Sequence, residues 1–262
     1  MVKRIAGMSC VAAVLAALGA APAVAGERYV ALGDSYSSGT GTREYFDSAC
    51  QRSVYAFPSL VDVQRANTDL VFAACSGAKT GDVLNTQVTS LTSDTRWVTI
   101  TIGGNDAGFS NVITQCALPS WLSNCTGAID TAQSYIRNTL PGRLDLVYNA
   151  IKSRSPSATV IVLSYPRLFM GVDCNAGTWF SSTEMTRLNE TADLLRDITR
   201  GRVTAAGLSF RFADAIGPFV GHAVCSSTAW LNGLSSPTSE SFHPNRTGQS
   251  SGYAPLVRAV MG

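Results

Sequence analysis

The sequence predicts a three-layer α/β/α sandwich, in which helices cover both faces of a parallel sheet. Two patterns support this fold class. Short apolar runs rich in valine, isoleucine and leucine alternate with longer helical patterns from about residue 28 to the end of the chain. The apolar runs are nearly continuous rather than interrupted by polar residues, which is typical of strands that are buried on both faces.

Taken in chain order, the patterns predict five strands and four longer helices. The strands are expected at 28–34, 70–77, 97–106, 158–166 and 209–214. The helices are expected at 57–65, 128–153, 182–206 and 247–260. The sequence contains no internal repeat, low-complexity tract or linker, so residues 26–262 are predicted to form a single domain.

The first 25 residues have the pattern of a secretory signal peptide. Lys3 and Arg4 form a basic start, an apolar run follows, and "APAVA" ends in the small-x-small pattern of a signal-peptidase site. The apolar run is too short to be a good membrane span. We therefore expect cleavage after Ala25 and a secreted, extracellular protein.

Charge and composition narrow the choice of partners. The chain has 20 basic and 18 acidic residues, and two of the basic ones lie in the predicted signal, so the remainder is close to neutral. Nucleic acid is not an expected partner, because binding it requires a basic face. No later apolar run is long enough to span a bilayer, so an integral membrane protein is not expected either.

Cysteine usage agrees with export. Six cysteines remain after Cys10 is removed with the signal, and an even count in an exported chain suggests three disulfides. Six cysteines allow 15 pairings, of which the local pair Cys116–Cys125 is the simplest to predict. The chain has no CxxC pair and only two histidines, so no zinc site is expected.

Three clusters of polar residues and glycine follow the first three predicted strands. They read "GDSYSSG", "CSGAKTGD" and "GGND". Ligand and active sites of open α/β sheets form beyond the carboxyl ends of the strands, so all three clusters are expected at one edge.

Ser35, in the first cluster, is a candidate nucleophile if a base can take its proton. Histidine suits that role near neutral pH, and the chain offers His222 and His243. His243 is favoured, because it lies in the polar loop "SESFHPNRTG" directly before the last helix, whereas His222 lies near Cys225.

With "SFHPN" as a fourth block, the chain resembles the secreted SGNH hydrolases, also called GDSL-type esterases and lipases. The four blocks occur in the order of that family, and the resemblance covers nearly all of residues 26–262. It implies a flavodoxin-like parallel sheet, with Ser35 as nucleophile and His243 as general base. It also implies an oxyanion hole made by the backbone N–H groups of Ser35 and Gly77 and the side-chain amide of Asn105. No metal or cofactor is required by such a mechanism.

The third member of the catalytic relay stays open between two acceptors. Glu240 stands where the family often has an aspartate, and its carboxylate is one candidate partner for His243. The other is the backbone carbonyl of Ser241, since some exported relatives use a carbonyl near the histidine. Asp34 and Asp106 are interpreted as turn carboxylates that accept loop N–H groups rather than as catalytic groups.

The resemblance also implies disulfides in sequence order, which are Cys50–Cys75, Cys116–Cys125 and Cys174–Cys225. It implies a carboxylic ester hydrolase acting on acyl esters of lipids, as a lipase or phospholipase A. The apolar loops "CALPSWLSNC" and "CNAGTWFSS" suggest an acyl pocket, a lipid-surface contact or packing on the core. The alternatives are a carbohydrate acetyl esterase, an acyltransferase and a non-catalytic secreted binding protein. A monomer is expected.

Overall fold

The computed structural model describes residues 1–3 and 26–262 of the chain. The predicted signal segment lies outside the described residues, apart from its first three. The described part is built on one parallel sheet of five strands in the order β2-β1-β3-β4-β5. The expected α/β class and flavodoxin-like strand order are therefore confirmed.

The strands begin close to their predicted positions, but the second and third end five residues earlier and the fourth ends three residues earlier. They are β1 (Glu27–Gly33), β2 (Thr68–Phe72), β3 (Trp97–Thr101), β4 (Thr159–Leu163) and β5 (Phe210–Ala213). The predicted ends of the second and third strands were wrong, because their last residues are the polar-glycine clusters. These clusters leave the sheet as loops at its carboxyl edge.

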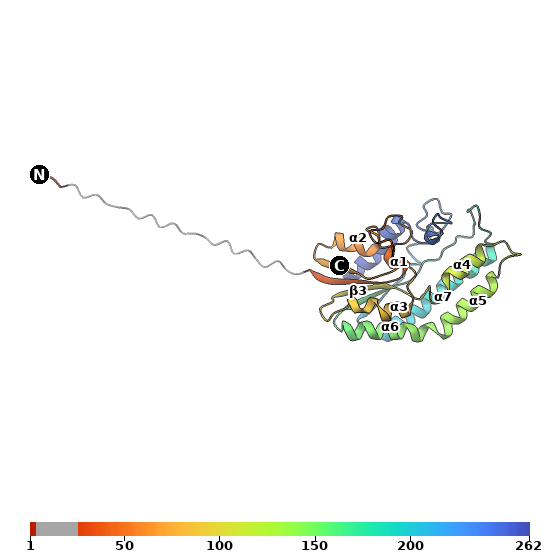
Figure 1. The fold of residues 1–262 in the computed structure, drawn as a ribbon, viewed down its shortest axis with the longest axis horizontal. Coiled ribbons are helices and arrows are strands. Elements are labelled where there is room, and N and C mark those ends of the chain that lie inside the picture. The colour runs from red at the N-terminus through yellow and green to blue at the C-terminus, as the bar shows by residue number, and fades with distance from the viewer. Residues whose placement is uncertain (4–25) are drawn as a thin grey trace.

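Two apolar cores lie on opposite faces of the sheet, because successive strand side chains alternate between the faces. Tyr29 and Ala31 of β1 join one core, and Val30 and Leu32 join the other. Helices α2 (Phe57–Gln64) and α8 (Ala254–Met261) cover the first face (Figure 1).

The opposite face is covered by α3 (Thr80–Asn85), α6 (Leu140–Arg154) and the second half of α7 (Ser182–Ala206). Helices α4 (Phe109–Ala117) and α5 (Cys125–Asn138) pack with the first half of α7. Together they extend beyond the carboxyl edge of the sheet (Figure 1).

The helix predictions were correct for α2 and α7 and wrong in detail elsewhere. The single helix expected at 128–153 is two helices, α5 and α6, which break at Thr139. Pro141, the second residue of α6, explains the break, because a proline fits the first turn of a helix but not its interior. The last helix begins as the π-helical segment η3 (Gly248–Tyr253) before continuing as α8.

Several short elements were missed because they lie within the polar clusters or have fewer than three turns. They are the one-turn helix α1 (Ser35–Ser38), α3, α4, and the 3₁₀ helices η1 (Gln87–Ser90) and η2 (Thr238–Glu240).

Three disulfides brace the loops at the carboxyl edge. They join Cys50 to Cys75, Cys116 to Cys125 and Cys174 to Cys225, which is the pairing that the family resemblance implies. The first connects the loop after β1 to the loop after β2. The second connects the end of α4 to the start of α5.

Candidate active site

The turn after β1 holds Ser35 at the centre of the sheet's carboxyl edge. Gly33 ends the strand with φ +123°, and a side chain there would lie 2.5 Å from the carbonyl oxygen of Thr101. Glycine is therefore required for β1 and β3 to approach each other this closely. Asp34 then caps α1, and Ser35 is the first residue of that one-turn helix.

Gln87, which sequence reasoning missed, completes the hydrogen bonding of this turn. Its side-chain amide donates to the carbonyl of Gly33 at 2.9 Å, and its Oε1 accepts the Gly33 N–H at 2.7 Å. The N–H of Cys75, just beyond β2, also donates to the Gly33 carbonyl, so Gln87 adds a second donor there and supplies the acceptor for the Gly33 N–H. A lone glutamine in a short 3₁₀ helix offers no sequence pattern from which this role could be read.

Ser35 and His243 are brought together from positions 208 residues apart. The Ser35 hydroxyl lies 2.8 Å from Nε2 of His243, and Nδ1 of His243 lies 2.9 Å from the carbonyl oxygen of Ser241. The Ser35 and His243 side chains are only 6% and 8% exposed. With a proton on Nδ1, the imidazole donates to Ser241 and presents a lone pair to Ser35.

Glu240, the other acceptor considered from sequence, faces a different partner. Its carboxylate accepts the Tyr45 hydroxyl at 2.7 Å and lies 3.6 Å from the guanidinium of Arg43. The Tyr45 hydroxyl in turn accepts the N–H of Gly41. Glu240 therefore joins the loop after β1 to the loop that carries His243. Of the two acceptors, the geometry favours the Ser241 carbonyl as the group that orients the imidazole.

Burial sets the protonation of His243. It lowers the pKa of the imidazole from its usual 6.5 to about 4, and the hydrogen bond to Ser241 opposes only part of that shift. The imidazole is consequently neutral at neutral pH, which is the form that can accept a proton from a serine hydroxyl.

Donors that could stabilise an oxyanion surround Ser35. Asn105 follows β3, and its side-chain amide donates to the carbonyl of Ala78 at 3.0 Å, which leaves its second N–H free of that bond. Within residues 26–262, the backbone N–H groups of Ser35 and Gly77 have no acceptor. Gly77 has φ +80°, and a side chain there would meet no atom within 4 Å. The space beside Gly77 is therefore open to a substrate.

The helix dipole contributes little at this site. Helix α1 has only four residues, so few peptide dipoles align behind Ser35. The individual N–H groups are the relevant donors.

The two aspartates of the motif blocks act in turns, as predicted. Asp34 accepts the backbone N–H of Tyr36 at 3.1 Å and the Thr101 hydroxyl at 2.8 Å, and it also accepts the Tyr165 hydroxyl. Asp106 accepts both the backbone N–H and the hydroxyl of Thr80, at 2.9 and 2.5 Å. Asp106 thereby joins the third motif block to the second.

Burial raises the pKa of Asp34 to about 6, against the opposing effect of its hydrogen bonds from Tyr165, Thr101 and the Tyr36 N–H. The carboxyl is therefore mainly ionised at neutral pH and remains a hydrogen-bond acceptor.

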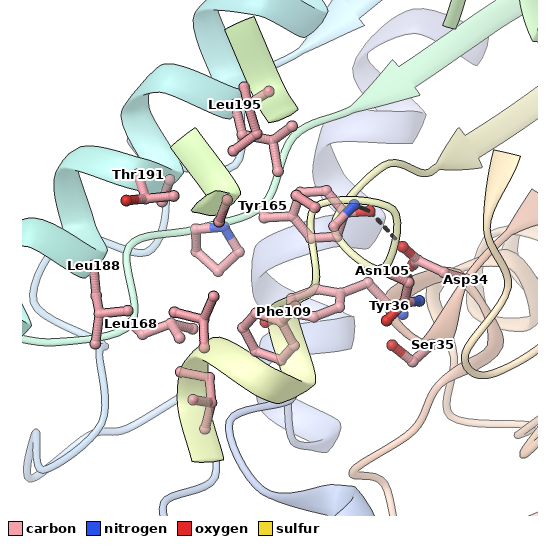
Figure 2. Close-up of a pocket in the computed structure, with 18 residues that line it drawn as sticks. Asp34, Ser35, Tyr36, Asn105, Phe109, Tyr165, Leu168, Leu188, Thr191 and Leu195 are labelled. Atoms are coloured by element: carbon pink, nitrogen blue, oxygen red, sulfur yellow. Dashed lines mark hydrogen bonds between the residues drawn. The ribbon is translucent and has the colours of Figure 1, made fainter. Parts of the chain in front are cut away.

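An apolar pocket begins at Ser35 and extends between α4, α5 and α7 (Figure 2). Asn105, Tyr165 and Phe109 line it near Ser35, and Leu188 and Leu195 of α7 line it farther away (Figure 2). The lining residues on α7 run from Leu188 to Leu195, which corresponds to about 10 Å along the helix axis. A pocket with this apolar lining suits an acyl chain.

The apolar loops predicted from sequence do not line this pocket. Trp121 and Leu122 are 79% and 64% exposed, and Trp179 is 55% exposed. Phe180 is buried in the core cluster that contains Leu188. Core packing was thus the right interpretation for Phe180 and for the buried Pro119, and not for the exposed Trp121, Leu122 and Trp179.

Other sequence candidates lie apart from Ser35. The His222 ring stacks on Trp230 at 3.8 Å, and its Nδ1 contacts the carbonyl of Thr228.

Across the described residues, no group of three or more His, Cys, Asp and Glu side chains could hold a metal ion. No helix within 1–3 or 26–262 is long and apolar enough to cross a membrane.

Comparison with known proteins places this arrangement in a family. The model of the GDSL-like lipase/acylhydrolase family matches residues 31–250. A lipase of Streptomyces rimosus is 44% identical over 254 residues, which is 94% of this chain and 93% of that protein.

Two solved structures are similar throughout. The crystal structure of an extracellular lipase from Streptomyces rimosus has a TM-score of 0.83 at 43% identity, covering 89% of this chain and 99% of that one. A phospholipase A1 from Streptomyces albidoflavus NA297 also has a TM-score of 0.83, at 42% identity, covering 90% of this chain and 99% of that one.

The fold and these matches define an ester hydrolase of the lipase/phospholipase type. The chain belongs to the GDSL-like lipase/acylhydrolase family.

We expect Glu240→Gln to keep kcat within about tenfold of the wild-type value, because its Oε1 can still accept the Tyr45 hydroxyl and the Ser241 carbonyl is untouched. Steady-state rates on a soluble p-nitrophenyl ester measure this, with His243→Ala as the inactive reference. A loss near the ~10⁴-fold seen when a triad carboxylate is replaced would instead make Glu240 the partner of His243.

Proposed function

We propose that this chain is a secreted enzyme that hydrolyses acyl esters of lipids through an acyl-enzyme on Ser35. The apolar pocket that begins at Ser35 is the single observation that carries the substrate class. An acetyl group would leave the far part of the pocket, at Leu188 and Leu195, unfilled. A longer acyl chain would bury its methylene groups there, at about 0.8 kcal/mol for each.

In the first half of the proposed reaction, the Ser35 hydroxyl attacks the ester carbonyl carbon. Its proton passes to Nε2 of His243, and the carbonyl electron pair moves onto the oxygen. The N–H groups of Ser35, Gly77 and Asn105 stabilise that negative charge, and one such donor is typically worth about 2.7–4 kcal/mol. When the intermediate collapses, the alcohol leaves with the proton from His243, and the acyl group stays on Ser35.

In the second half, water attacks the acyl-enzyme and gives its proton to His243. Collapse of the second tetrahedral intermediate releases the fatty acid and returns the proton to Ser35. The Ser241 carbonyl holds the same imidazole tautomer throughout, because it accepts the Nδ1 proton. No charged group has to enter the buried site to complete this cycle.

The alternative functions differ in what they require of the pocket. A carbohydrate acetyl esterase would need room for a sugar beside a small acyl site. An acyltransferase would use the same residues but would need water excluded from the acyl-enzyme. A binding protein would have no use for a hydroxyl-imidazole contact of 2.8 Å. The long apolar pocket favours hydrolysis of lipid esters over these three.

The substrate class is tested by rates on p-nitrophenyl esters of rising chain length, triglyceride, phosphatidylcholine and acetylated xylan. We expect kcat/KM to rise from acetate to a medium-length chain and Ser35→Ala to lose at least about a thousandfold of the activity. The variant Ala192→Phe places a ring in the pocket and should lower kcat/KM for long esters by about tenfold or more, leaving the acetate ester within about threefold.

Ala205→Phe is the matched control, since Ala205 lies on the exposed side of the same helix α7. Its chain-length profile should equal that of the wild type. A preference for acetate or acetylated xylan in the wild-type enzyme would overturn the lipid assignment, and full activity in Ser35→Ala would overturn the mechanism.

The low pKa of His243 predicts activity well into the acid range. The neutral imidazole is the reactive form, and protonation inactivates it, so a pKa lowered to about 4 moves the loss of activity to lower pH. We expect the acid limb of kcat/KM for a soluble ester to have its midpoint near 4 rather than at the usual 6.5. Samples returned to neutral pH should recover, which separates titration from unfolding.

A midpoint at 6 or above that persists in Asp34→Asn would contradict a buried neutral base. A midpoint that moves in that variant would belong to Asp34 instead, because burial raises its pKa to about 6.

We also propose that Trp121, Leu122 and Trp179 contact a lipid surface. They lie on neighbouring loops, because the N–H of Trp179 donates to the carbonyl of Ala117 at 3.2 Å. These loops join α4 to α5 and precede α7, the helices that line the apolar pocket. Neither "CALPSWLSNC" nor "CNAGTWFSS" contains a charged residue, so zwitterionic or neutral lipid suits them better than an anionic surface.

A double variant, Trp121→Ser with Trp179→Ser, should weaken binding to phosphatidylcholine vesicles by about tenfold or more in a sedimentation assay. Its kcat/KM on a soluble acetate ester should stay at the wild-type value. The control replaces Val63 and Leu208 by serine, which are 82% and 90% exposed and lie near the opposite, amino edge of the sheet. Equal vesicle binding by the wild type and the tryptophan variant would show that Trp121 and Trp179 do not contact lipid.

We further propose export through the predicted signal in residues 1–25 and action as a monomer. The extracellular Streptomyces rimosus lipase supports export, and the placement of Ser35, His243, Gly77 and Asn105 on one chain supports the monomer. The N-terminal sequence and light-scattering mass of protein recovered from culture medium test both.

A further inference from the structure

Tyr165 lies between the two loops that would handle the reacting carbonyl. It follows β4, and its phenol donates to Asp34 Oδ2, in the nucleophile turn (Figure 2). The same oxygen accepts the backbone N–H of Gly104 at 3.2 Å. Gly104 directly precedes Asn105, so one phenolic oxygen contacts the neighbours of both Ser35 and Asn105.

The phenol is held as a donor to Asp34. Burial raises the pKa of Tyr165 well above its usual value, and the nearby Asp34 carboxylate raises it further. The hydroxyl therefore keeps its proton and cannot exchange roles with the ionised carboxylate. This gives the hydrogen bonds one direction, from Gly104 N–H to Tyr165 and from Tyr165 to Asp34.

Residue 104 is shaped to receive this phenol. A side chain on Gly104 would lie 3.3 Å from Cζ of Tyr165 and 3.4 Å from its oxygen, so any larger residue would press against the ring. The glycine of "GGND" therefore serves the contact with Tyr165 as well as the turn. The ring also packs edge-on against Tyr36 at 5.0 Å, and the Tyr36 hydroxyl donates to the carbonyl of Phe242, beside His243.

We propose that Tyr165 is a positioning residue, whose hydroxyl sets the separation of Ser35 and Asn105 by joining the turn of Asp34 to the N–H of Gly104. It acts through these neighbours and does not exchange a proton with the substrate. The ring forms one wall of the acyl pocket, so its removal would change binding, whereas removal of the hydroxyl alone would change the oxyanion geometry. The proposal rests on the proposed roles of Ser35 and Asn105.

Loss of the Tyr165 hydroxyl should destabilise the tetrahedral intermediate and leave substrate binding nearly unchanged. A displacement of about 1 Å between nucleophile and oxyanion donors can cost about a hundredfold in rate, whereas ground-state binding of an acyl chain depends on the pocket wall. Two inhibitors separate these effects. Octaneboronic acid forms a tetrahedral adduct with a serine oxygen, and octanoate binds as a planar carboxylate without a covalent bond.

For Tyr165→Phe we expect kcat on p-nitrophenyl octanoate to fall by about ten- to a hundredfold. Inhibition by octaneboronic acid should weaken by a similar factor. KM and the inhibition constant of octanoate should stay within about threefold of wild type, because the aromatic ring remains in place. A purely structural role would change both inhibitors alike.

Tyr29→Phe is the matched control, because it also removes one buried phenolic hydroxyl. That hydroxyl lies 2.8 Å from the hydroxyl of Thr99, and the two residues are on the neighbouring strands β1 and β3. Tyr29→Phe should leave both inhibition constants and kcat within about threefold. Asp34→Asn provides a second route, since it keeps the phenol and removes its anionic acceptor. Asp34→Asn should weaken inhibition by octaneboronic acid more than inhibition by octanoate. If Tyr165→Phe does not fold, this comparison tests the proposal in its place.

Boronate inhibition and kcat within threefold of wild type in Tyr165→Phe would overturn the proposal, as would equal weakening of boronate and octanoate. Ser35→Ala, assayed beside Tyr165→Phe, separates failure of the proposed function from failure of the role proposed for Tyr165. If Ser35→Ala remains active, the proposed function itself is wrong. If Ser35→Ala is inactive and Tyr165→Phe behaves as wild type, only the role of Tyr165 fails.

Discussion

The close approach of β1 and β3 at their carboxyl ends is the constraint on which the site depends. Gly33 permits it, because any side chain there would collide with the Thr101 carbonyl. Thr101 then donates its hydroxyl to Asp34, and its backbone N–H donates to the hydroxyl of Ser37. The turn that carries Ser35 is thus fastened to the strand that leads to Asn105. In a parallel sheet with this strand order, β1 and β3 meet at the point where ligands are generally bound.

Most polar side chains at this edge are buried or half-buried and hydrogen-bonded, which explains how a loop-built site can be rigid. A buried polar group without a partner costs roughly 1–3 kcal/mol, so a network in which each member is satisfied has few alternative arrangements. Asp34 accepts hydrogen bonds from its own turn, from β3 and from Tyr165, and Asp106 accepts two from Thr80 of the second motif block. Their carboxylates therefore fix the positions of the loops, and the proposed proton transfers use a hydroxyl and a neutral imidazole.

The loop that carries His243 is held to the rest of the site by distant contacts. The Tyr36 hydroxyl donates to the carbonyl of Phe242, a residue with φ +60° that directly precedes the histidine. Gln249 of the π-helical segment donates to the carbonyl of Tyr36, and Glu240 accepts the hydroxyl of Tyr45. These contacts place the imidazole within 2.8 Å of Ser35 and at the same time bury it. Burial keeps the imidazole neutral at neutral pH, so the packing that positions His243 also sets its charge.

The sequence by itself determined the α/β class, the placement of the motif clusters at strand ends, and the small set of residues able to act as nucleophile and base. These features follow from local apolar patterns and from the scarcity of histidine, which are readable without coordinates. Only the tertiary structure shows that His243 contacts the Ser241 carbonyl while Glu240 contacts Tyr45. It also reveals the contacts of Gln87 and Tyr165, and it separates the pocket-lining side chains of α7 from the exposed Trp121 and Trp179. Those distinctions depend mainly on burial, on side-chain direction and on contacts between segments that are from about 50 to 200 residues apart. None of these features produces a periodic pattern in the sequence.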